Sequence, residues 1–520
     1  MRTSNLATMT RGRRSKALSA SDTVTERSTV IQAYVWLAVP TVIWLATWVR
    51  LWIGLPLALG VALAVSLIIR RARSNKLHAP EFKNFRIDRK YKIIMALAVV
   101  YVISTGVGAV WYQYGGDHMF RNGIFFELVR NPWPVNHPEP DGTPSVLCYY
   151  TGFWLLPALV SKLCFGYIIP GNIALFLYAL WGMYIILNFI FAHFGGASWK
   201  VFLIFLFFDG WDIVITAIIP GFESWSDVLW EQKDISTGYY HSNVVFTYFG
   251  YTYNQAYAAL IGLLLIWHRH RDVRQLLLTY SLMFISAPFV AVGIFPVVAW
   301  LLIRRFRVSL TWQNVLAILV LLVEACYFAS NNRAMKPGGE TYPVEMPFVV
   351  MSLIFVVFAY GVYMPWLWKR VRRDALFWVL FVIMLFGPLL SLGRTFDMGW
   401  RVGVPFAYYF MLKMMEYVTD VHKWRRPRNV LLSIVLAVGA LAPATFYTCT
   451  VISPFLHWAG RDDILAYCNR KDPANYQFEW QKIWLQQRLH DKKSNWMYNN
   501  FWAEGRTPYT EFLMPRRESE

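Results

Sequence analysis

The chain has 520 residues, of which 57% are hydrophobic and 18% aromatic, and its mean hydropathy is +0.36. This composition, with its many apolar runs of about twenty residues, excludes a soluble globular protein and predicts a polytopic membrane protein. The formal net charge is +19, yet the Lys and Arg residues gather in short segments between apolar runs. Because that pattern marks cytoplasmic loops, we expect membrane lipids and not nucleic acid around the basic residues.

The cysteines form neither a CxxC pair nor a Cys/His spacing, so the sequence indicates no zinc site and no redox motif. They are Cys148, Cys164, Cys326, Cys449 and Cys468. We interpret each of them as an isolated small apolar residue.

Residues 1–92 are expected to form an N-terminal unit. Basic residues precede the first apolar run and no small-residue cleavage site follows it, which predicts an uncleaved first helix with a cytoplasmic N-terminus. Residues 30–48 and 52–70 are predicted to form a tight helical pair. The basic segment from Arg70 to Lys92 then marks the cytoplasmic side, where it could contact anionic headgroups.

Residues 93–452 are expected to form the transmembrane domain, an all-α polytopic helical bundle. Residues 93–111 are predicted to cross outward and to deliver a large loop, 112–150, to the outer side. The next apolar stretch, 150–166, is short and contains a proline and a lysine, so we expect it to be half-inserted. With that assignment every later basic cluster lies on the cytoplasmic side, in agreement with the positive-inside rule.

The remaining apolar runs bring the prediction to about 13 transmembrane helices, with the C-terminus on the outer side. The further crossings are 171–193, 199–219, 245–267, 274–288, 289–304, 312–330, 347–368, 374–392, 405–422 and 428–452. The pair 274–304 is short in both halves, and we interpret it as a shallow hairpin with its turn at Pro288. Residues 453–520 are polar and are expected to form a small appendage on the outer face.

The outer loop 112–150 contains the first candidate catalytic residue. Asp117 follows the predicted end of a membrane helix by about six residues, so it should lie close to the lipid headgroups. The apolar residues of 119–130 recur at helical spacing, which predicts a short helix along the membrane surface with Arg121 and Glu127 on its polar side. The helix should end at Asn131, because proline follows.

Under this topology, polar clusters from four segments meet on the outer side. They contain Asp117, His118, Arg121 and Asn122; Asp209, Asp212 and Glu223; Glu340; and Arg394, Asp397 and Arg401. Arginine binds phosphate in a bidentate manner and a carboxylate can take a proton from an attacking hydroxyl, so such a gathering suits a phosphate-bearing lipid substrate.

Structural roles without catalysis remain open for the same residues. Asp117 is equally an ordinary solvated carboxylate beside a glycine turn. Arg401 could extend toward the headgroups or pair with Asp397, and Asp209 with Asp212 could be hydrogen-bond partners or metal ligands. Glu324 lies within an apolar span, which is unusual, and the sequence assigns it no partner.

The segment GGDHMFRNGIFFELVRNPWPV, followed by YYTGFWLLPALVSKL, resembles the first outer loop of GT-C superfamily glycosyltransferases, especially uncharacterised bacterial members. RTFDMGWRVGVP is similar to their late motif of an acidic residue, a spaced arginine and a proline before a helix. The resemblance covers roughly residues 90 to 425. It implies an inverting transferase of the bacterial inner membrane that moves a sugar from a polyprenyl-phosphate or polyprenyl-diphosphate donor to a glycan or lipid acceptor of the cell envelope.

The resemblance also implies roles for single residues. Asp117 matches the loop carboxylate proposed as general base, and Arg401, with Arg394, matches the arginine that holds the donor phosphate. Relatives often carry a second acidic residue; here Glu127 or Asp212 would have to serve, which leaves a divalent metal (Mg²⁺ or Mn²⁺) possible and undecided.

Two other functional classes remain as alternatives to the glycosyltransferase. A lipid or polysaccharide flippase or transporter would line a passage with the same charges, although the sequence has no detectable internal repeat and its charges cluster on the outer side. A non-catalytic partner in envelope assembly would use the C-terminal appendage for binding.

Overall fold

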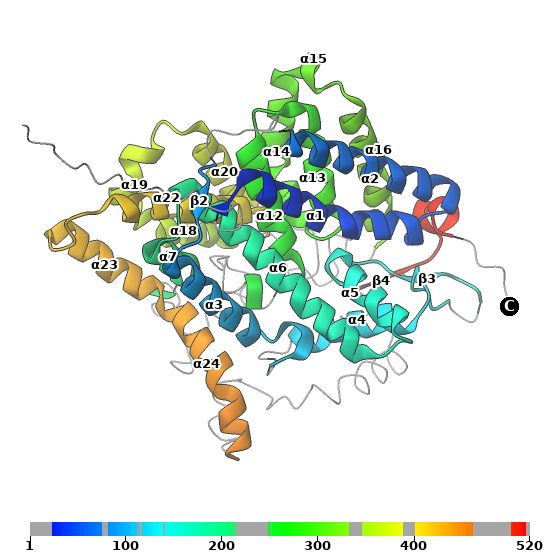
Figure 1. The fold of residues 1–520 in the computed structure, drawn as a ribbon, viewed down its shortest axis with the longest axis horizontal. Coiled ribbons are helices and arrows are strands. Elements are labelled where there is room, and N and C mark those ends of the chain that lie inside the picture. The colour runs from blue at the N-terminus through cyan, green and yellow to red at the C-terminus, as the bar shows by residue number, and fades with distance from the viewer. Residues whose placement is uncertain are drawn as a thin grey trace, which may run out of the picture.

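The structure of the chain is a computed structural model. It describes residues 23–74, 82–111, 113, 117–138, 141–211, 213–214, 248–250, 252–331, 346–387, 401–460 and 501–515. These residues are mostly helical (Figure 1), and their strands form two short antiparallel pairs, β1 (Thr23–Val24) with β2 (Phe85–Arg86) and β3 (Ser145–Leu147) with β4 (Trp502–Glu504). The predicted all-α class is therefore confirmed for the described part of the chain.

Four described helices are long and apolar enough to cross a membrane. They are α1 (Glu26–Trp48), α2 (Leu51–Arg73), α6 (Ile168–Phe194) and α16 (Trp312–Ala329). A fifth candidate is the pair α23 (Pro427–Gly439) and α24 (Leu441–Trp458), which is bent by 45°. These helices support a membrane protein, whereas the predicted total of about 13 crossings goes beyond them.

The predicted N-terminal helical pair is confirmed. Thr25 caps α1 by accepting a hydrogen bond from the Ser28 backbone N–H, and the helix runs to Trp48. The chain turns at Val49 and Arg50 into α2, and Gly54 of α2 lies against the Leu45 carbonyl, where any side chain would overlap with it. A glycine at this contact lets the two helices approach closely.

The predicted crossing 93–111 is shorter in the structure. Helix α3 (Arg89–Ser104) begins at an Asp88 cap and stops at Ser104. Gly106 and Gly108 then adopt positive φ angles of 72° and 75°, which glycine adopts without steric cost, and so the chain turns before it reaches the outer loop.

The outer loop contains helix α4 (Asp117–Arg130), which ends where the proline after Asn131 predicted. Its polar side does not face water as expected, because Arg121 is only 6% exposed and Glu127 only 2%. The reason is tertiary: α5 (Gly152–Leu163) and the end of the loop pack against α4. With 12 residues, α5 is about 18 Å long, shorter than the roughly 30 Å hydrocarbon core, which agrees with the prediction that 150–166 does not cross.

Several predicted crossings are interrupted. Helix α7 (Trp199–Phe207) ends before Asp209, so the predicted helix 199–219 is broken there. The predicted crossing 347–368 divides into α18 (Met346–Gly361) and α19 (Met364–Val371). The expected turn near Pro288 is present between α13 (Leu276–Phe284) and α14 (Pro288–Arg304).

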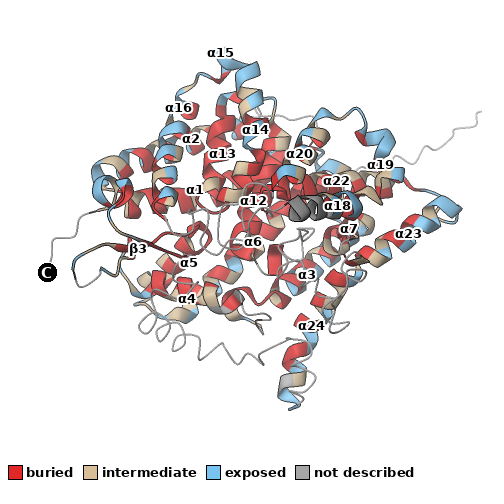
Figure 2. Cartoon of the chain, turned by 180° about the vertical axis from the view of Figure 1, so that it is seen from behind, coloured by how far each residue is buried: buried red, intermediate tan, exposed pale blue. Residues whose placement is uncertain are grey.

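The centre of the bundle is formed by α12 (Tyr253–Arg269), whose residues are almost all buried (Figure 2). It packs on α6 and α13, and α1 joins α6 through Trp36, whose ring stacks on Tyr178 at 4.4 Å. Helices α20 (Ala375–Phe386) and α22 (Val404–Asp420) pack against each other. Close aromatic contacts of this kind stabilise helix association in a membrane, where burial of apolar surface alone gives no advantage over contact with lipid tails.

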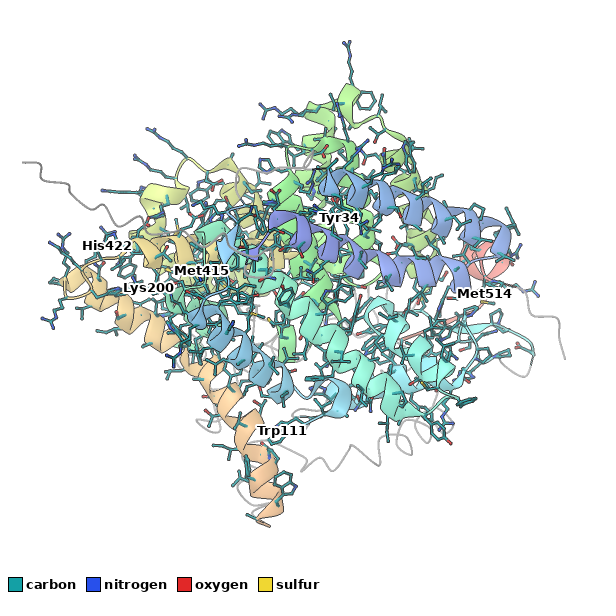
Figure 3. The ribbon with its side chains drawn as sticks, viewed as in Figure 1. Tyr34, Trp111, Lys200, Met415, His422 and Met514 are labelled. Atoms are coloured by element: carbon teal, nitrogen blue, oxygen red, sulfur yellow. The ribbon has the colours of Figure 1, made fainter. Side chains whose placement is uncertain are left out.

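The basic segments gather at one end of the bundle. The Lys83 N–H donates to the Ala192 carbonyl at 3.1 Å, Lys200 Nζ donates to the Val421 carbonyl at 2.9 Å, and Arg370 pairs with Asp420 at 2.5 Å. Figure 3 labels Lys200 and His422 at one side of the ribbon and Met514 at the opposite side. This grouping agrees with the positive-inside assignment.

The C-terminal residues return to the opposite end of the bundle. Strand β4 pairs with β3 of the outer loop, and the turn Tyr509–Leu513 contacts the α1–α2 connection, where the Arg50 N–H donates to the Leu513 carbonyl at 2.6 Å. The observed segment therefore differs from the predicted appendage 453–520 in two ways. Helix α24 extends through its first residues to Trp458, and residues 501–515 pack on the bundle. Residues 461–500 lie outside the described part.

Tyr509→Ala is expected to lower the stability of the folded protein by about 3 kcal/mol or more, as for other large aromatic residues removed from a core. Tyr509 is 1% exposed, and its hydroxyl donates to the Trp48 carbonyl at 2.7 Å. The matched control is Phe512→Ala in the same turn, because Phe512 is 63% exposed. Thermal unfolding of the detergent-solubilised protein measures both, and equal midpoints would contradict the docking of this segment.

Candidate functional site

Helix α4 presents two buried basic side chains to the N-terminus of α12. The His118 ring stacks on Tyr253 with centroids 5.6 Å apart, and the Arg121 guanidinium lies over the same ring at 5.6 Å. Arg121 Nε also donates to Asn254 Oδ1 at 3.3 Å. These contacts hold the polar side of the first two turns of α4 inside the protein, on an aromatic surface.

Arg401 lies at the same region of the bundle, although it comes from a distant part of the chain. Its Nη1 donates to the Tyr150 hydroxyl at 2.8 Å, and its guanidinium lies over the rings of Tyr150 and Phe289 at 5.7 and 5.6 Å. Arg401 is only 8% exposed. A guanidinium retained at such depth needs aromatic and hydrogen-bonding contacts of this kind.

Arg401 donates to one member of a tyrosine pair, and both arginines act electrostatically on the other member. The Tyr149 hydroxyl donates to the Tyr150 hydroxyl. Burial, with a smaller effect of Tyr150, raises the pKa of Tyr149 well above its usual value, while Arg401 and Arg121 both act electrostatically in the opposite direction. Tyr149 thus stays a neutral hydrogen-bond donor. Such a group of donors is suited to an oxyanion, above all a phosphate.

The backbone before α22 positions Arg401. Gly293 of α14 lies directly against the Val402 carbonyl, and a Cβ at Gly293 would overlap with that oxygen and come within 2.9 Å of the carbonyl carbon. Phe289, one turn earlier on α14, contacts the Arg401 guanidinium. Helix α14 therefore fixes both the backbone position and the side-chain direction of Arg401.

Asn122 and Glu127 have structural partners. Asn122 exchanges two amide hydrogen bonds with Gln113, at 2.5 and 3.3 Å, and Gln113 also donates to the Gly106 carbonyl. Glu127 accepts from Asn131 at 2.7 Å and lies 2.9 Å from His137 Nε2. Glu127 thus ties the loop to α4, which makes it a poor choice for the second acid of the site.

The other predicted site residues are not tested by the structure. Asp117 is the first residue of α4, and its side chain lies outside the described residues. The same holds for the whole of Arg394, Asp212, Glu223, Glu340 and Asp397. The described residues therefore unite His118, Arg121, Asn122 and Arg401 at one end of the bundle, with Asp117 adjacent to them in the chain.

The tyrosines were missed as site residues by sequence reasoning. Tyr149 and Tyr150 are visible in the sequence as a pair directly after the outer loop, and Tyr253 and Asn254 directly precede an apolar run. Their position at the ends of apolar segments was a usable signal, because aromatic residues with a polar tip favour such boundaries.

The described residues contain no group of three or more His, Cys, Asp or Glu side chains placed to hold a metal ion. Among the described residues, Cys148, Cys164, Cys326 and Cys449 are free thiols. Cys148 is buried and its Sγ donates to the Tyr327 carbonyl; burial raises the pKa of this thiol.

The candidate site is thus a buried cluster of two arginines, a histidine and three tyrosines, from α4, the segment before α5, α12 and the segment before α22. Comparisons of the chain with protein-family models, with curated proteins and with solved structures found no match.

Proposed function

We propose that the chain is a GT-C-type glycosyltransferase that moves a hexose or pentose from a polyprenyl-phosphate or polyprenyl-diphosphate donor to an envelope glycan or lipid acceptor. The observation that carries the proposal is the burial of two arginines among neighbouring tyrosines: Arg401 donates to Tyr150, which is hydrogen-bonded to Tyr149, and Arg121 lies over Tyr253. An anion that bound there would be enclosed by donors from separate segments of the chain. A lipid phosphate is the anion that a membrane supplies in this position.

The chemistry assigned to the site is a single displacement with inversion. The acceptor hydroxyl attacks the anomeric carbon of the sugar, and the bond from that carbon to the donor phosphate oxygen breaks. Asp117 takes the hydroxyl proton as general base. The leaving phosphate gains negative charge, which Arg401 and Arg121 stabilise, and the Tyr149 and Tyr150 hydroxyls extend the donor set.

The surroundings favour this reaction in two ways. Asp117 precedes Arg121 by one helical turn, about 6 Å along the axis, so the proposed base and Arg121 share one side of α4. Tyr253, Phe289 and Trp154 would form the aromatic walls of the donor site, and Trp154 Nε1 donates to the Tyr253 hydroxyl at 3.4 Å. Aromatic walls exclude water, which would otherwise compete as acceptor.

The proposal includes the topology inferred from the sequence. About 13 crossings, with the N-terminus in the cytoplasm and the C-terminus outside, would hold the site at the outer rim of a bacterial inner membrane. The contacts of Arg50 with Leu513 and of β3 with β4 support one common side for the α1–α2 turn, the outer loop and the C-terminal segment. Arg394 would assist Arg401 at the phosphate, and any divalent metal stays part of the proposal only.

The test of the catalytic assignment is Asp117→Asn, assayed for sugar transfer in membranes supplied with donor lipid. We expect transfer to fall by about 100-fold or more, because the substitution removes the proton acceptor without a large change of shape. Asp141→Asn is the matched control, since Asp141 is an exposed carboxylate of the same loop that accepts from the Thr143 N–H. Unchanged transfer by Asp117→Asn would remove Asp117 as the base.

One observation favours the alternative of a flippase or transporter. Glu324 of α16 is completely buried, and neither carboxyl oxygen has a hydrogen-bond partner among the described residues. Ionisable residues at membrane depth often serve ion or substrate pathways. If the chain is a transporter, Glu324→Gln should stop lipid-sugar translocation while Asp117→Asn leaves it intact; the opposite result supports the transferase.

A further inference from the structure

An apolar groove opens on the face of the bundle formed by α13, α14 and α16. Its volume is about 700 Å³, within the range of about 300–1,000 Å³ typical of small-molecule sites. The lining is almost entirely apolar, with Tyr280, Phe295, Ile318 and Leu322 among its walls. Phe295, Ile318 and Leu322 are each about half exposed, at 49%, 48% and 57%.

The groove faces the place where lipid tails would lie. Helix α16, which forms one wall, is a candidate membrane span, and its exposed residues Val315, Ile318 and Leu322 line the groove. A groove on the outside of a spanning helix is filled by hydrocarbon and not by water. The occupant must therefore have an apolar chain.

Two exposed arginines adjoin the lining residues at one end of the groove. Ile303 and Phe306 line that end, and Arg304 and Arg307 are their exposed neighbours in α14 and α15 (Phe306–Ser309). No Asp or Glu occurs between residues 273 and 323, so this corner, which projects at the edge of the bundle (Figure 1), has no acidic residue in its own segment.

From this combination we propose that the groove binds an anionic phospholipid, with one acyl chain between α14 and α16 and the phosphate headgroup at Arg304 and Arg307. The apolar walls match the chain, and the two guanidiniums match the phosphate by charge and by bidentate geometry. The end concerned is the one where Arg305 donates to the Arg271 carbonyl at 2.8 Å. It belongs to the basic, cytoplasmic side, whose leaflet is rich in anionic lipid.

This site is distinct from the proposed donor site. Phe289, which contacts Arg401, and Arg304 lie at opposite ends of α14, about 22 Å apart at 1.5 Å per residue. A single phosphate cannot contact both ends. The lipid proposed here is thus a bound membrane component, and it does not depend on sugar transfer.

The test uses purified full-length protein in bilayer discs with two photoactivatable probes of identical acyl chains, phosphatidylglycerol and phosphatidylcholine. After irradiation, peptides are mapped by mass spectrometry. We expect phosphatidylglycerol to label residues 288–325 about tenfold more than phosphatidylcholine, since each arginine near an anionic headgroup contributes appreciably to its attraction. The face of α23 around Ile434, 54% exposed, should label both lipids equally.

Two variants separate the charge from the chain contacts. Arg304→Gln with Arg307→Gln should remove the preference for phosphatidylglycerol, whereas Arg372→Gln with Arg373→Gln, in a basic turn elsewhere, should leave it unchanged. Ala299→Trp, which fills the groove, should reduce labelling by both lipids. Equal labelling of wild type by the two lipids, a preference that survives the arginine substitutions, or a groove protected by a second copy of the chain would each overturn the proposal.

Discussion

Arg401→Gln is expected to lower donor-dependent sugar transfer by about 100-fold or more, because removing one donor from a developing oxyanion commonly costs 10²–10³ in kcat. Arg401 is buried and oriented by Tyr150 and Phe289, so a glutamine cannot supply the charge from the same position. The measurement is the rate of transfer in membranes at saturating donor. Thermal unfolding of the purified variant shows whether the fold is retained.

Two further variants make this expectation specific. Arg401→Lys keeps the charge but loses the bidentate geometry, so it should retain part of the activity. Arg130→Gln is the matched control, because Arg130 is an exposed arginine at the end of α4 whose guanidinium lies over the Phe126 ring at 5.5 Å. Transfer by Arg401→Gln at the rate of this control would contradict the phosphate-binding assignment.

The second large effect is expected from Gly293→Ala. A methyl group at this position of α14 would overlap with the Val402 carbonyl, and backbone cannot move aside as a flexible side chain can. We expect a loss of about 1–3 kcal/mol of stability from overpacking. Displacement of Arg401 by even a fraction of an ångström should lower transfer by about tenfold to 100-fold.

Gly361→Ala is the matched control for this substitution. Gly361 lies at the end of α18, and among the described residues its added Cβ would meet only the Val357 side chain, at 3.8 Å. The pair should therefore differ in both thermal midpoint and transfer rate. If Gly293→Ala were as active and as stable as Gly361→Ala, the close contact of α14 with the Arg401 backbone would be wrong.

The helices with continuous apolar runs were predictable from the sequence. The pair α1–α2, the long helix α6 and the span α16 lie where the runs of hydrophobic residues predicted, because about twenty apolar residues have few alternatives to a membrane helix. The end of α4 at Arg130 followed from proline chemistry in the same way. Local sequence rules suffice where a segment's own composition dominates its structure.

The interrupted helices were not predictable from hydropathy. Residues 199–219 are apolar almost throughout, yet α7 stops at Phe207, where the Asp209 side chain accepts from the Gly210 N–H and the Tyr363 hydroxyl donates to the Asp209 carbonyl. The predicted crossing 428–452 bends between α23 and α24. Hydropathy averages over a window and therefore does not detect a break that side chains from other helices stabilise.

The candidate site likewise has residues that the sequence identified and contacts that only the structure revealed. Asp117, His118 and Arg121 were identifiable from their place in a polar loop, and Arg401 from its charge at the end of an apolar run. Sequence alone did not reveal that Arg121 is buried on Tyr253 or that Arg401 donates to Tyr150. These contacts join residues more than a hundred positions apart, and no local rule reports them.

Membrane residence and helical class thus follow from composition, since hydrophobic runs of this length leave the backbone no other way to satisfy its hydrogen bonds in lipid. The burial of Arg121 on Tyr253 and of Arg401 on Phe289 depends on how α4, α12 and α14 pack. Packing is decided by the shapes of many side chains together, and the contact of Gly293 with Val402 is one that only the folded arrangement makes visible.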